Sequence, residues 1–303
     1  MKCKATWVWV AVATIFATVA QAQYSPSLMP PQVTAHPSTS ASINGNGGAK
    51  NDVVAPPATA TCSYTFTVPG NLNSYLSFCV SVNGNIVSLQ SPNGFDYIAQ
   101  GGIGEGYGIC DASTNASYYD WAYADSGNWN APVLVSNTTA AVKIARTTTD
   151  GLWTLTQTIA KQTGVQPYAK VTMAIKNNST VEKAAYLTRY ADVDPGAAPN
   201  TDTVYNESFD STQYNVWGYA PLNAPVGGVS IGLGLKEIGG PNPYVPYGFN
   251  GLAMNTSTGP DPCNPVANYA GYQASVDGSI AMVWTLTIPA RKSTTVAAKY
   301  ETF

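Results

Sequence analysis

Apolar and polar residues alternate with a period of two in several segments of the chain, most clearly near its C-terminal end. In SIAMVWTLTIP, residues 279–289, Ile280, Met282, Trp284, Leu286 and Ile288 alternate with Ala, Val and Thr. The segments GLWTLTQTIA and AKVTMAIKN repeat this pattern. Successive side chains of a strand point to opposite faces of its sheet, so the period predicts β-strands with one face on a core.

Turn signals separate these runs. Asn83-Gly84, Asn93-Gly94 and Asp150-Gly151 are dipeptides that tolerate a positive φ and close hairpins. No segment from residue 60 onward has a sustained helical period, and charged residues make up only 10% of the chain. The sequence therefore predicts an all-β fold, in which residues 60–303 form a single antiparallel β-sandwich domain.

The first 59 residues have a different composition. Lys2 and Lys4 precede an apolar run that ends in the small-x-small pattern Ala20-Gln21-Ala22, which predicts a signal peptide over residues 1–22. The run is shorter than the ~20 residues of a membrane-spanning helix. Residues 23–59 are rich in Pro, Ser and Ala and predict a disordered leader. We therefore expect a secreted or periplasmic protein without a transmembrane segment in its mature form.

The charge distribution excludes nucleic acid as a partner. The chain has a formal net charge of −3, and loss of Lys2 and Lys4 would make it more acidic. No basic run remains, and Arg146, Arg189 and Arg291 lie far apart in the sequence. Nucleic-acid binding requires several Lys or Arg side chains on one face to neutralise phosphates.

Four cysteines follow the signal peptide: Cys62, Cys79, Cys110 and Cys263. In an exported protein, an even number indicates two disulfides, for which three connectivities exist. We expect Cys62–Cys79 to link neighbouring strands and Cys110–Cys263 to tie the Gly-rich segment to the loop GPDPCNP. A zinc site is the alternative, but no C-x-x-C pair occurs and the single histidine, His36, lies in the leader.

The Gly-rich segment GGIGEGYG, residues 101–108, lacks the G-x-G-x-x-G spacing and the following helix of a phosphate-binding loop. Its glycines are better interpreted as positions where strands or a ligand approach the backbone closely.

Four segments carry a family resemblance: VNGNIVSLQSPNGFDYIAQGGIGEGYGIC, RTTTDGLWTLTQT, VTMAIKNNSTVEKAAYLTRYADVD and TIPARKSTTVAAKY. Together they resemble secreted bacterial β-sandwich proteins of uncharacterised function. In strand order they are also similar to galactose-mutarotase-like supersandwich domains, over about Tyr75 to Tyr300. The resemblance implies a carbohydrate ligand. It does not carry over mutarotase activity, which relies on histidine with a carboxylate, because no histidine follows His36.

The same lack of histidine disfavours Ser-His-Asp and Cys-His catalysis. A glycosidase needs only two carboxylates, and the candidates beside aromatic residues are Glu105, Asp111, Glu207 and Asp210. The alternative is that each carboxylate caps a turn or faces solvent, and on balance the sequence favours a protein that is not an enzyme.

Aromatic residues give a positive signal for ligand binding. Tyr119, Trp121 and Tyr123 share one face of an alternating run, and Trp217 lies in a second aromatic run. Such rings can stack on sugar faces, although aromatic residues at strand period also form cores. Together with Glu105 and Arg189, they are the candidate ligand-binding residues.

Asp192, Asp194, Asn200 and Asp202 crowd the stretch RYADVDPGAAPNTD. They offer oxygen ligands for Ca²⁺, provided that Pro195-Gly196 reverses the chain. The stretch does not match an EF-hand. The alternative is an acidic turn in which Asp192 or Asp194 pairs with an inward-pointing Arg189, because a buried guanidinium requires a carboxylate.

These observations predict an exported, non-catalytic β-sandwich protein that binds carbohydrate or another component of the cell envelope. The alternatives are a glycan-acting hydrolase or lyase that uses a carboxylate pair, and a structural or adhesion module. Calcium is the one cofactor that the sequence suggests.

Overall fold

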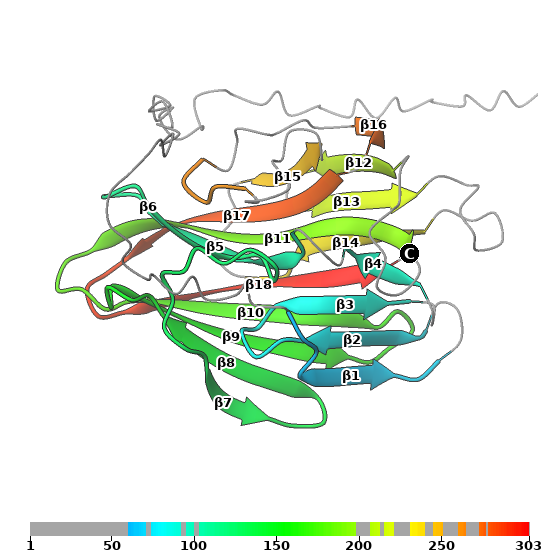
Figure 1. Ribbon diagram of the computed structural model, residues 1–303, viewed down its shortest axis with the longest axis horizontal. Coiled ribbons are helices and arrows are strands. Elements are labelled where there is room, and N and C mark those ends of the chain that lie inside the picture. The colour runs from blue at the N-terminus through cyan, green and yellow to red at the C-terminus, as the bar shows by residue number, and fades with distance from the viewer. Residues whose placement is uncertain are drawn as a thin grey trace, which may run out of the picture. The chain divides into compact units, whose positions relative to one another are not determined.

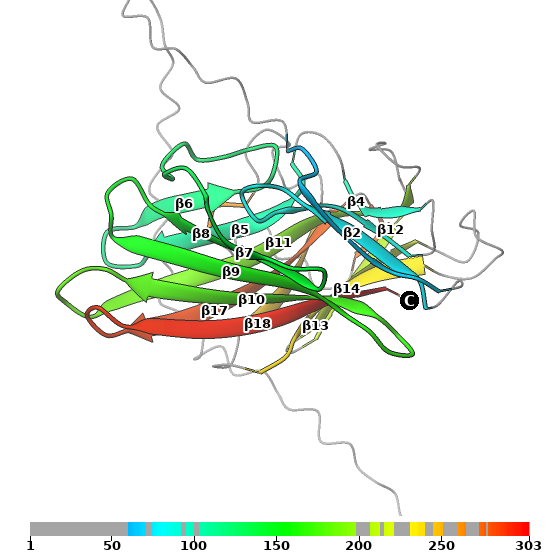
Figure 2. The same ribbon diagram turned by 90° about the horizontal axis from the view of Figure 1, so that it is seen from below.

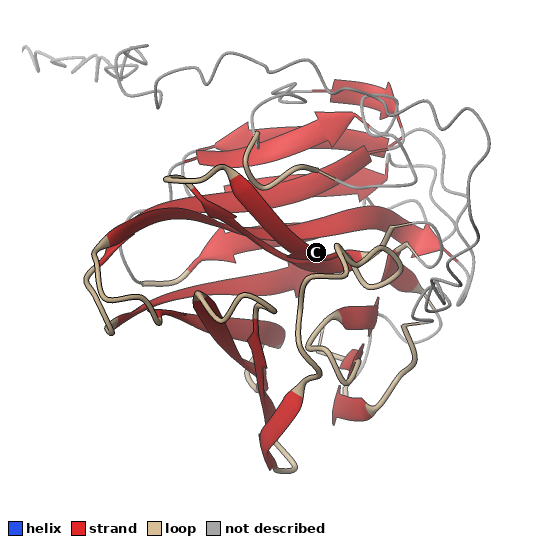
Figure 3. Cartoon of the chain, turned by 60° about the vertical axis from the view of Figure 1, so that its left-hand side comes forward, coloured by secondary structure: helices blue, strands red, loops and turns tan. Residues whose placement is uncertain are grey.

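The computed structural model describes residues 60–70, 74–91, 95–99, 103–197, 207–212, 215–220, 231–239, 245–250, 260–264, 273–276 and 278–302. The expected signal peptide and leader lie outside these ranges. Every named element within them is a β-strand, as Figure 3 shows, and all strand pairs are antiparallel. The predicted all-β, antiparallel fold is confirmed.

The first sheet has the order β1-β2-β3-β4-β11-β17-β15, with β5 paired to β11 and β6 paired to β5. Its strands are β1 (Tyr64–Val68), β2 (Leu76–Val80), β3 (Ile86–Gln90), β4 (Asp96–Ile98), β5 (Glu105–Asp111), β6 (Ala116–Asp120), β11 (Lys183–Ala197), β15 (Val245–Asn250) and β17 (Gly278–Ile288).

The second sheet has the order β16-β12-β13-β14-β18-β10-β9-β8-β7. Its strands are β7 (Val133–Asn137), β8 (Ala141–Thr147), β9 (Trp153–Gln162), β10 (Tyr168–Asn177), β12 (Glu207–Thr212), β13 (Asn215–Ala220), β14 (Ile231–Glu237), β16 (Gln273–Val276) and β18 (Ser293–Thr302).

The two sheets pack against each other, and the main core lies between them. Figure 1 shows β11 and β17 of the first sheet above β10 and β18 of the second, and Figure 2 shows β8, β9, β10 and β18 side by side. The core joins Met282 and Trp284 of β17 to Val171 and Met173 of β10, all of them fully buried. Burying these apolar faces supplies the main driving force for the sandwich.

Strand β17 has the predicted core face, but its other face is buried as well. Ala281 and Val283, on the outer face, form a smaller cluster with Ile103, Trp121 and Tyr190. The segment after β6 therefore covers the outside of the first sheet. This covering explains why β17 is apolar on both faces over part of its length.

Glycine makes this covering possible. A Cβ atom on Gly106 would lie 1.8 Å from the backbone oxygen of Asp120, and one on Gly108 would lie 2.4 Å from Pro262. The predicted role of the Gly-rich segment in close backbone approach is confirmed at these two positions. The hairpins at Asn83-Gly84 and Asp150-Gly151 are also confirmed, with φ values of 92° at Gly84 and 72° at Gly151, whereas Asn93-Gly94 lies outside the described residues.

Strand β11 continues where the sequence suggested a reversal. It pairs with β17 along one edge, and with β5 and then β4 along the other. The expected reversal at Pro195-Gly196 is wrong, because β11 extends to Ala197. The register shifts between Val193 and Ala197, which is an irregularity that accommodates a proline without a donor N–H.

Both disulfides have the expected connectivity. Cys62 pairs with Cys79 across a sequence separation of 17 residues, and Cys110 pairs with Cys263 across 153 residues. The first links the start of β1 to β2. The second fastens the 260–264 segment to β5.

Removing the two bridges should have unequal effects, because a longer closed loop restricts the unfolded chain more. The loop lengths predict a loss of about 3 kcal/mol for Cys62→Ala/Cys79→Ala and about 5 kcal/mol for Cys110→Ala/Cys263→Ala. Urea unfolding of the oxidised proteins measures both. A larger loss for the shorter loop would contradict the prediction.

Candidate functional site

Arg189 and Glu105 form an ion pair inside the molecule. Both side chains have 0% exposure, and Arg189 Nε contacts Glu105 Oε1. The two residues lie on the paired strands β11 and β5, where Ala191 is opposite Glu105. Their burial leaves no surface on which to contact a ligand from solvent, and it corrects their assignment as ligand-binding residues.

The partner of Arg189 also differs from the expected one. The acidic-turn alternative pairs Arg189 with Asp192 or Asp194, but the period of two places both aspartates on the opposite face of β11 from Arg189. On that outer face, Asp192 Oδ1 accepts a hydrogen bond from Ser279 Oγ at 3.1 Å. Strand geometry therefore separates the arginine from both nearby aspartates and leaves it to pair with a carboxylate on the neighbouring strand.

The ion pair joins the two sheets. Glu105 Oε1 accepts a hydrogen bond from the Tyr300 hydroxyl of β18 at 2.7 Å, and Glu105 Oε2 accepts one from the Ile86 N–H at 2.6 Å. Arg189 Nη1 donates to Gln157 Oε1 of β9 at 2.6 Å. Because Tyr300 and Gln157 belong to the second sheet, the pair fixes the position of one sheet on the other.

A second buried cluster surrounds Arg146, whose exposure is 6%. Its Nη1 contacts Asp120 Oδ2 at 2.6 Å and Asp125 Oδ2 at 3.1 Å, and it donates to the Tyr107 hydroxyl at 3.1 Å. The guanidinium also lies 5.3 Å from the centroid of the Trp129 ring. This cluster links β8 of the second sheet to the end of β6.

Burial perturbs the carboxyl groups of both clusters. It raises the pKa of Glu105 to about 7, against the charge of Arg189, which lowers it. Burial also raises the pKa of Asp120 to about 6, against the charge of Arg146. In each case desolvation of the carboxylate outweighs the neighbouring guanidinium.

Of the candidate catalytic carboxylates, Glu105 and Asp111 are the two whose side chains the structure describes, and these two do not converge. Glu105 and Asp111 lie at opposite ends of β5, and Asp111 pairs with Lys183 at 2.6 Å. Glu207 and Asp210 lie on β12, and their side chains fall outside the described part. Both candidates with described side chains, Glu105 and Asp111, are thus engaged in ion pairs.

The aromatic strip divides between the core and the surface. Trp121 has 0% exposure, with the Tyr119 ring stacked at 5.7 Å and the Tyr190 ring at 5.2 Å. Its assignment to a sugar platform is therefore wrong, because Trp121 fills the cluster on the outer face of β17. Tyr123 is half-buried and lines a groove, whereas Trp217 lies on β13 with its side chain outside the described part.

The calcium site lacks the reversal at Pro195-Gly196 that would bring its ligands together, so it would require the chain to turn after β11, and it stays a prediction. Asp192 and Asp194 lie near the end of β11, and Asn200 and Asp202 are outside the described residues. Among the residues that the structure describes, no group of three or more His, Cys, Asp or Glu side chains is arranged to hold a metal ion.

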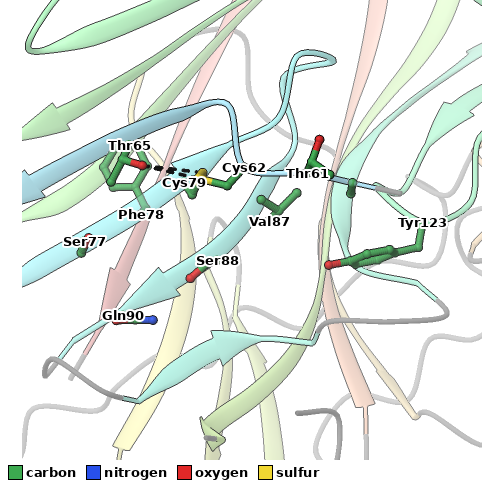
Figure 4. A pocket seen from close by; sticks show the side chains of 11 residues that line it. Thr61, Cys62, Thr65, Ser77, Phe78, Cys79, Val87, Ser88, Gln90 and Tyr123 are labelled. Atoms are coloured by element: carbon green, nitrogen blue, oxygen red, sulfur yellow. Dashed lines mark hydrogen bonds between the residues drawn. A yellow bond between two sulfur atoms is a disulfide. The ribbon is translucent and has the colours of Figure 1, made fainter. Parts of the chain in front are cut away.

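A groove lies on the outer face of β1, β2 and β3. Its volume is about 470 Å³. Figure 4 shows the Tyr123 ring on one side of it and Ser77 and Gln90 on the other, with the Cys62–Cys79 disulfide between them. The lining residues are Ala60, Thr61, Cys62, Thr65, Ser77, Phe78, Cys79, Val87, Ser88, Gln90 and Tyr123.

The lining is partly polar, partly apolar and uncharged. It combines hydroxyl groups, one carboxamide and the Tyr123 ring with apolar side chains and a disulfide, and no acidic or basic residue is among the residues that line it. Burial, with a contribution from the charge of Asp96, raises the pKa of Tyr123, so its hydroxyl stays protonated at neutral pH. Of the residues that line the groove, only Tyr123 is among the ligand-binding candidates that the sequence pattern indicates. The alternation of Thr65 and Thr67 with Phe66 and Val68 was the signal for a polar outer face.

No protein-family model matches the chain, and no curated protein matches it either. Among solved structures, a bacterial glucoamylase complexed with acarbose aligns with 85% of this chain and 34% of its own, at 11% identity and a TM-score of 0.49. A 4-alpha-glucanotransferase from Thermococcus litoralis aligns with 78% of this chain and 37% of its own, at 10% identity and a TM-score of 0.39.

Both neighbours are carbohydrate-active enzymes, and the chain spans about a third of their length. Within the residues that the structure describes, no helix is long and apolar enough to cross a membrane.

The raised carboxyl pKa values predict a pH dependence of stability. Between about pH 5 and pH 8, the folded protein binds more protons at Glu105 and Asp120 than the unfolded chain does, so the unfolding free energy should fall as pH rises. The expected fall is about 4 kcal/mol in urea unfolding, because each pKa unit corresponds to about 1.4 kcal/mol. Glu105→Gln should flatten this dependence, and a rise in stability over the same range would contradict it.

The buried ion pair predicts strong coupling between its members. Arg189→Met or Glu105→Leu alone leaves an uncompensated buried charge and should cost about 3–5 kcal/mol. The double substitution should cost less than the sum of the two, as measured by chemical denaturation. The exposed Arg291→Met is the matched control and should change stability by less than about 0.5 kcal/mol. Additive single effects would contradict the coupling.

Proposed function

We propose that this protein is an exported, non-catalytic β-sandwich protein that binds an uncharged carbohydrate in the groove on the outer face of β1, β2 and β3. The observation that carries the proposal is the groove lining, in which the Tyr123 ring stands opposite hydroxyl and carboxamide groups. A sugar presents an apolar C–H face to an aromatic ring and hydroxyls to polar groups. The two disulfides support an oxidising compartment.

The uncharged lining favours a neutral ligand. An ionised sugar would lose hydration in the groove without meeting an opposite charge among the residues that line it, and this desolvation is unfavourable. A neutral sugar would instead exchange its hydrogen bonds with water for hydrogen bonds with the hydroxyls of Thr65, Ser77 and Ser88 and the amide of Gln90. We therefore infer selection against uronic acids and other anionic sugars.

Binding without turnover agrees with the position of the carboxylates. Hydrolysis of a glycosidic bond uses two carboxyl groups about 5–9.5 Å apart on either side of the bond. The described groove lining contains neither Asp nor Glu. The candidates Glu105 and Asp111 are held in ion pairs.

Calorimetric titration with uncharged oligosaccharides of glucose, xylose, mannose and galactose, each beside a uronic-acid oligosaccharide, tests the proposal. Tyr123→Ala should weaken binding of a neutral oligosaccharide by about 1–3 kcal/mol, because it removes the ring that the sugar packs against. The control is Tyr168→Ala, since Tyr168 is also half-buried but lies on β10, away from the groove.

Three results would count against the proposal. One is that no neutral oligosaccharide binds, and another is that Tyr168→Ala weakens binding as much as Tyr123→Ala. The third is the release of new reducing ends during incubation, which would favour a glycan-acting enzyme.

A further inference from the structure

We propose that the turn at Asp120–Ala124 is a positioning device that holds the Tyr123 ring as a rigid wall of the groove, in the pose that stacks on a sugar face. This inference rests on the proposed function for the identity of the ligand. The positioning itself is a property of the protein alone.

The turn is tight and closed by hydrogen bonds. Asp120 and Asp125 form an isolated antiparallel bridge, and the Trp121 N–H donates to the Ala124 oxygen at 2.9 Å. The Tyr123 N–H donates to the Trp121 oxygen at 2.8 Å. Ala122 and Tyr123 therefore stand at the tip of a two-residue reversal, so the direction of the Tyr123 side chain depends on the backbone of Ala122.

Ala122 adopts a backbone conformation that alanine rarely occupies. Its φ is 66°, in the left-handed region where glycine or asparagine is usual. Such strain persists only where the surroundings impose it, and it is concentrated at functional sites. Here the imposing group is Asp120, whose Oδ1 accepts the Ala122 N–H at 2.9 Å. Asp120 is itself fixed by Arg146 at 2.6 Å.

The Tyr123 ring rests directly on the backbone of Gly104. A Cβ atom on Gly104 would lie 3.0 Å from two ring carbons of Tyr123, so a larger residue would push the ring from its place. Ala122 packs with Cys79 and Val87, which line the groove, and Tyr123 packs against the same cluster. The Tyr123 ring therefore contacts Gly104 on one side and the cluster of Cys79, Val87 and Ala122 on another.

These contacts give the strained alanine a function. Glycine at position 122 would relieve the backbone strain but would also free the turn and remove the methyl group that packs against Cys79 and Val87. Alanine keeps the ring in one orientation before a ligand arrives. A wall that is already ordered spares the ligand the entropy cost of ordering it.

The test compares Ala122→Gly with Ala124→Gly, which alters the same turn at a residue of ordinary φ. The first readout needs no ligand: NMR relaxation of the Tyr123 ring in protein with ¹³C-labelled tyrosine. Ala122→Gly should increase the ring's mobility, and Ala124→Gly should not. An equally rigid ring in Ala122→Gly would overturn the positioning role, whatever the protein binds.

The second readout is calorimetric titration with the neutral oligosaccharides used above. Ala122→Gly should weaken binding about two- to tenfold while urea unfolding stays near that of the native chain, whereas Tyr123→Phe should keep most of the affinity. A mobile ring with unchanged affinity would overturn the stacking role. If no oligosaccharide binds the native protein, the proposed function and the stacking role both fail, and the relaxation data still decide whether the turn positions Tyr123.

Discussion

The ion pair between Arg189 and Glu105 constrains the rest of the sandwich because neither charge has access to water. An unpaired charge in such a core is strongly unfavourable, so the fold must bring β5 and β11 into the one register that joins them. The second sheet supplies further hydrogen-bond partners to the pair, Tyr300 on β18 for Glu105 and Gln157 on β9 for Arg189. Apolar burial holds the two sheets together, and this polar contact fixes which positions face one another.

The Arg146 cluster extends this constraint from the core to the surface. Arg146 comes from the second sheet, and its partner Asp120 ends β6 of the first. The second carboxylate oxygen of Asp120 accepts the Ala122 N–H, and the next residue, Tyr123, forms a wall of the groove. A groove that is neutral in its own lining therefore depends on charges buried behind it. The ion pair that holds the ligand-facing ring thus lies outside the groove lining.

Much of the fold could be predicted from local pattern, and much of the site could not. Alternation in the segments around Trp153, Met173 and Trp284 identifies strands and their core faces, and the even cysteine count with the expected link between neighbouring strands indicates the disulfides. The partner of Arg189 is not predictable in this way, because Glu105 is distant in the sequence and strand geometry points the nearby Asp192 to the opposite face. Trp121 was placed on a platform because alternation marks a face without showing what covers it.

The sequence by itself determined that the chain is all-β, which positions face the core, and that its glycines permit close backbone approach. These properties follow from residues a few positions apart, so local spacing contains them. Only the tertiary structure decided that Glu105 neutralises Arg189 and that Trp121 is buried against Tyr190. It also decided that Tyr123 lines a groove together with residues on the outer face of β1, β2 and β3. Each of these contacts joins segments distant in the chain, and their proximity arises from strand order and sheet packing, which the period of two does not encode.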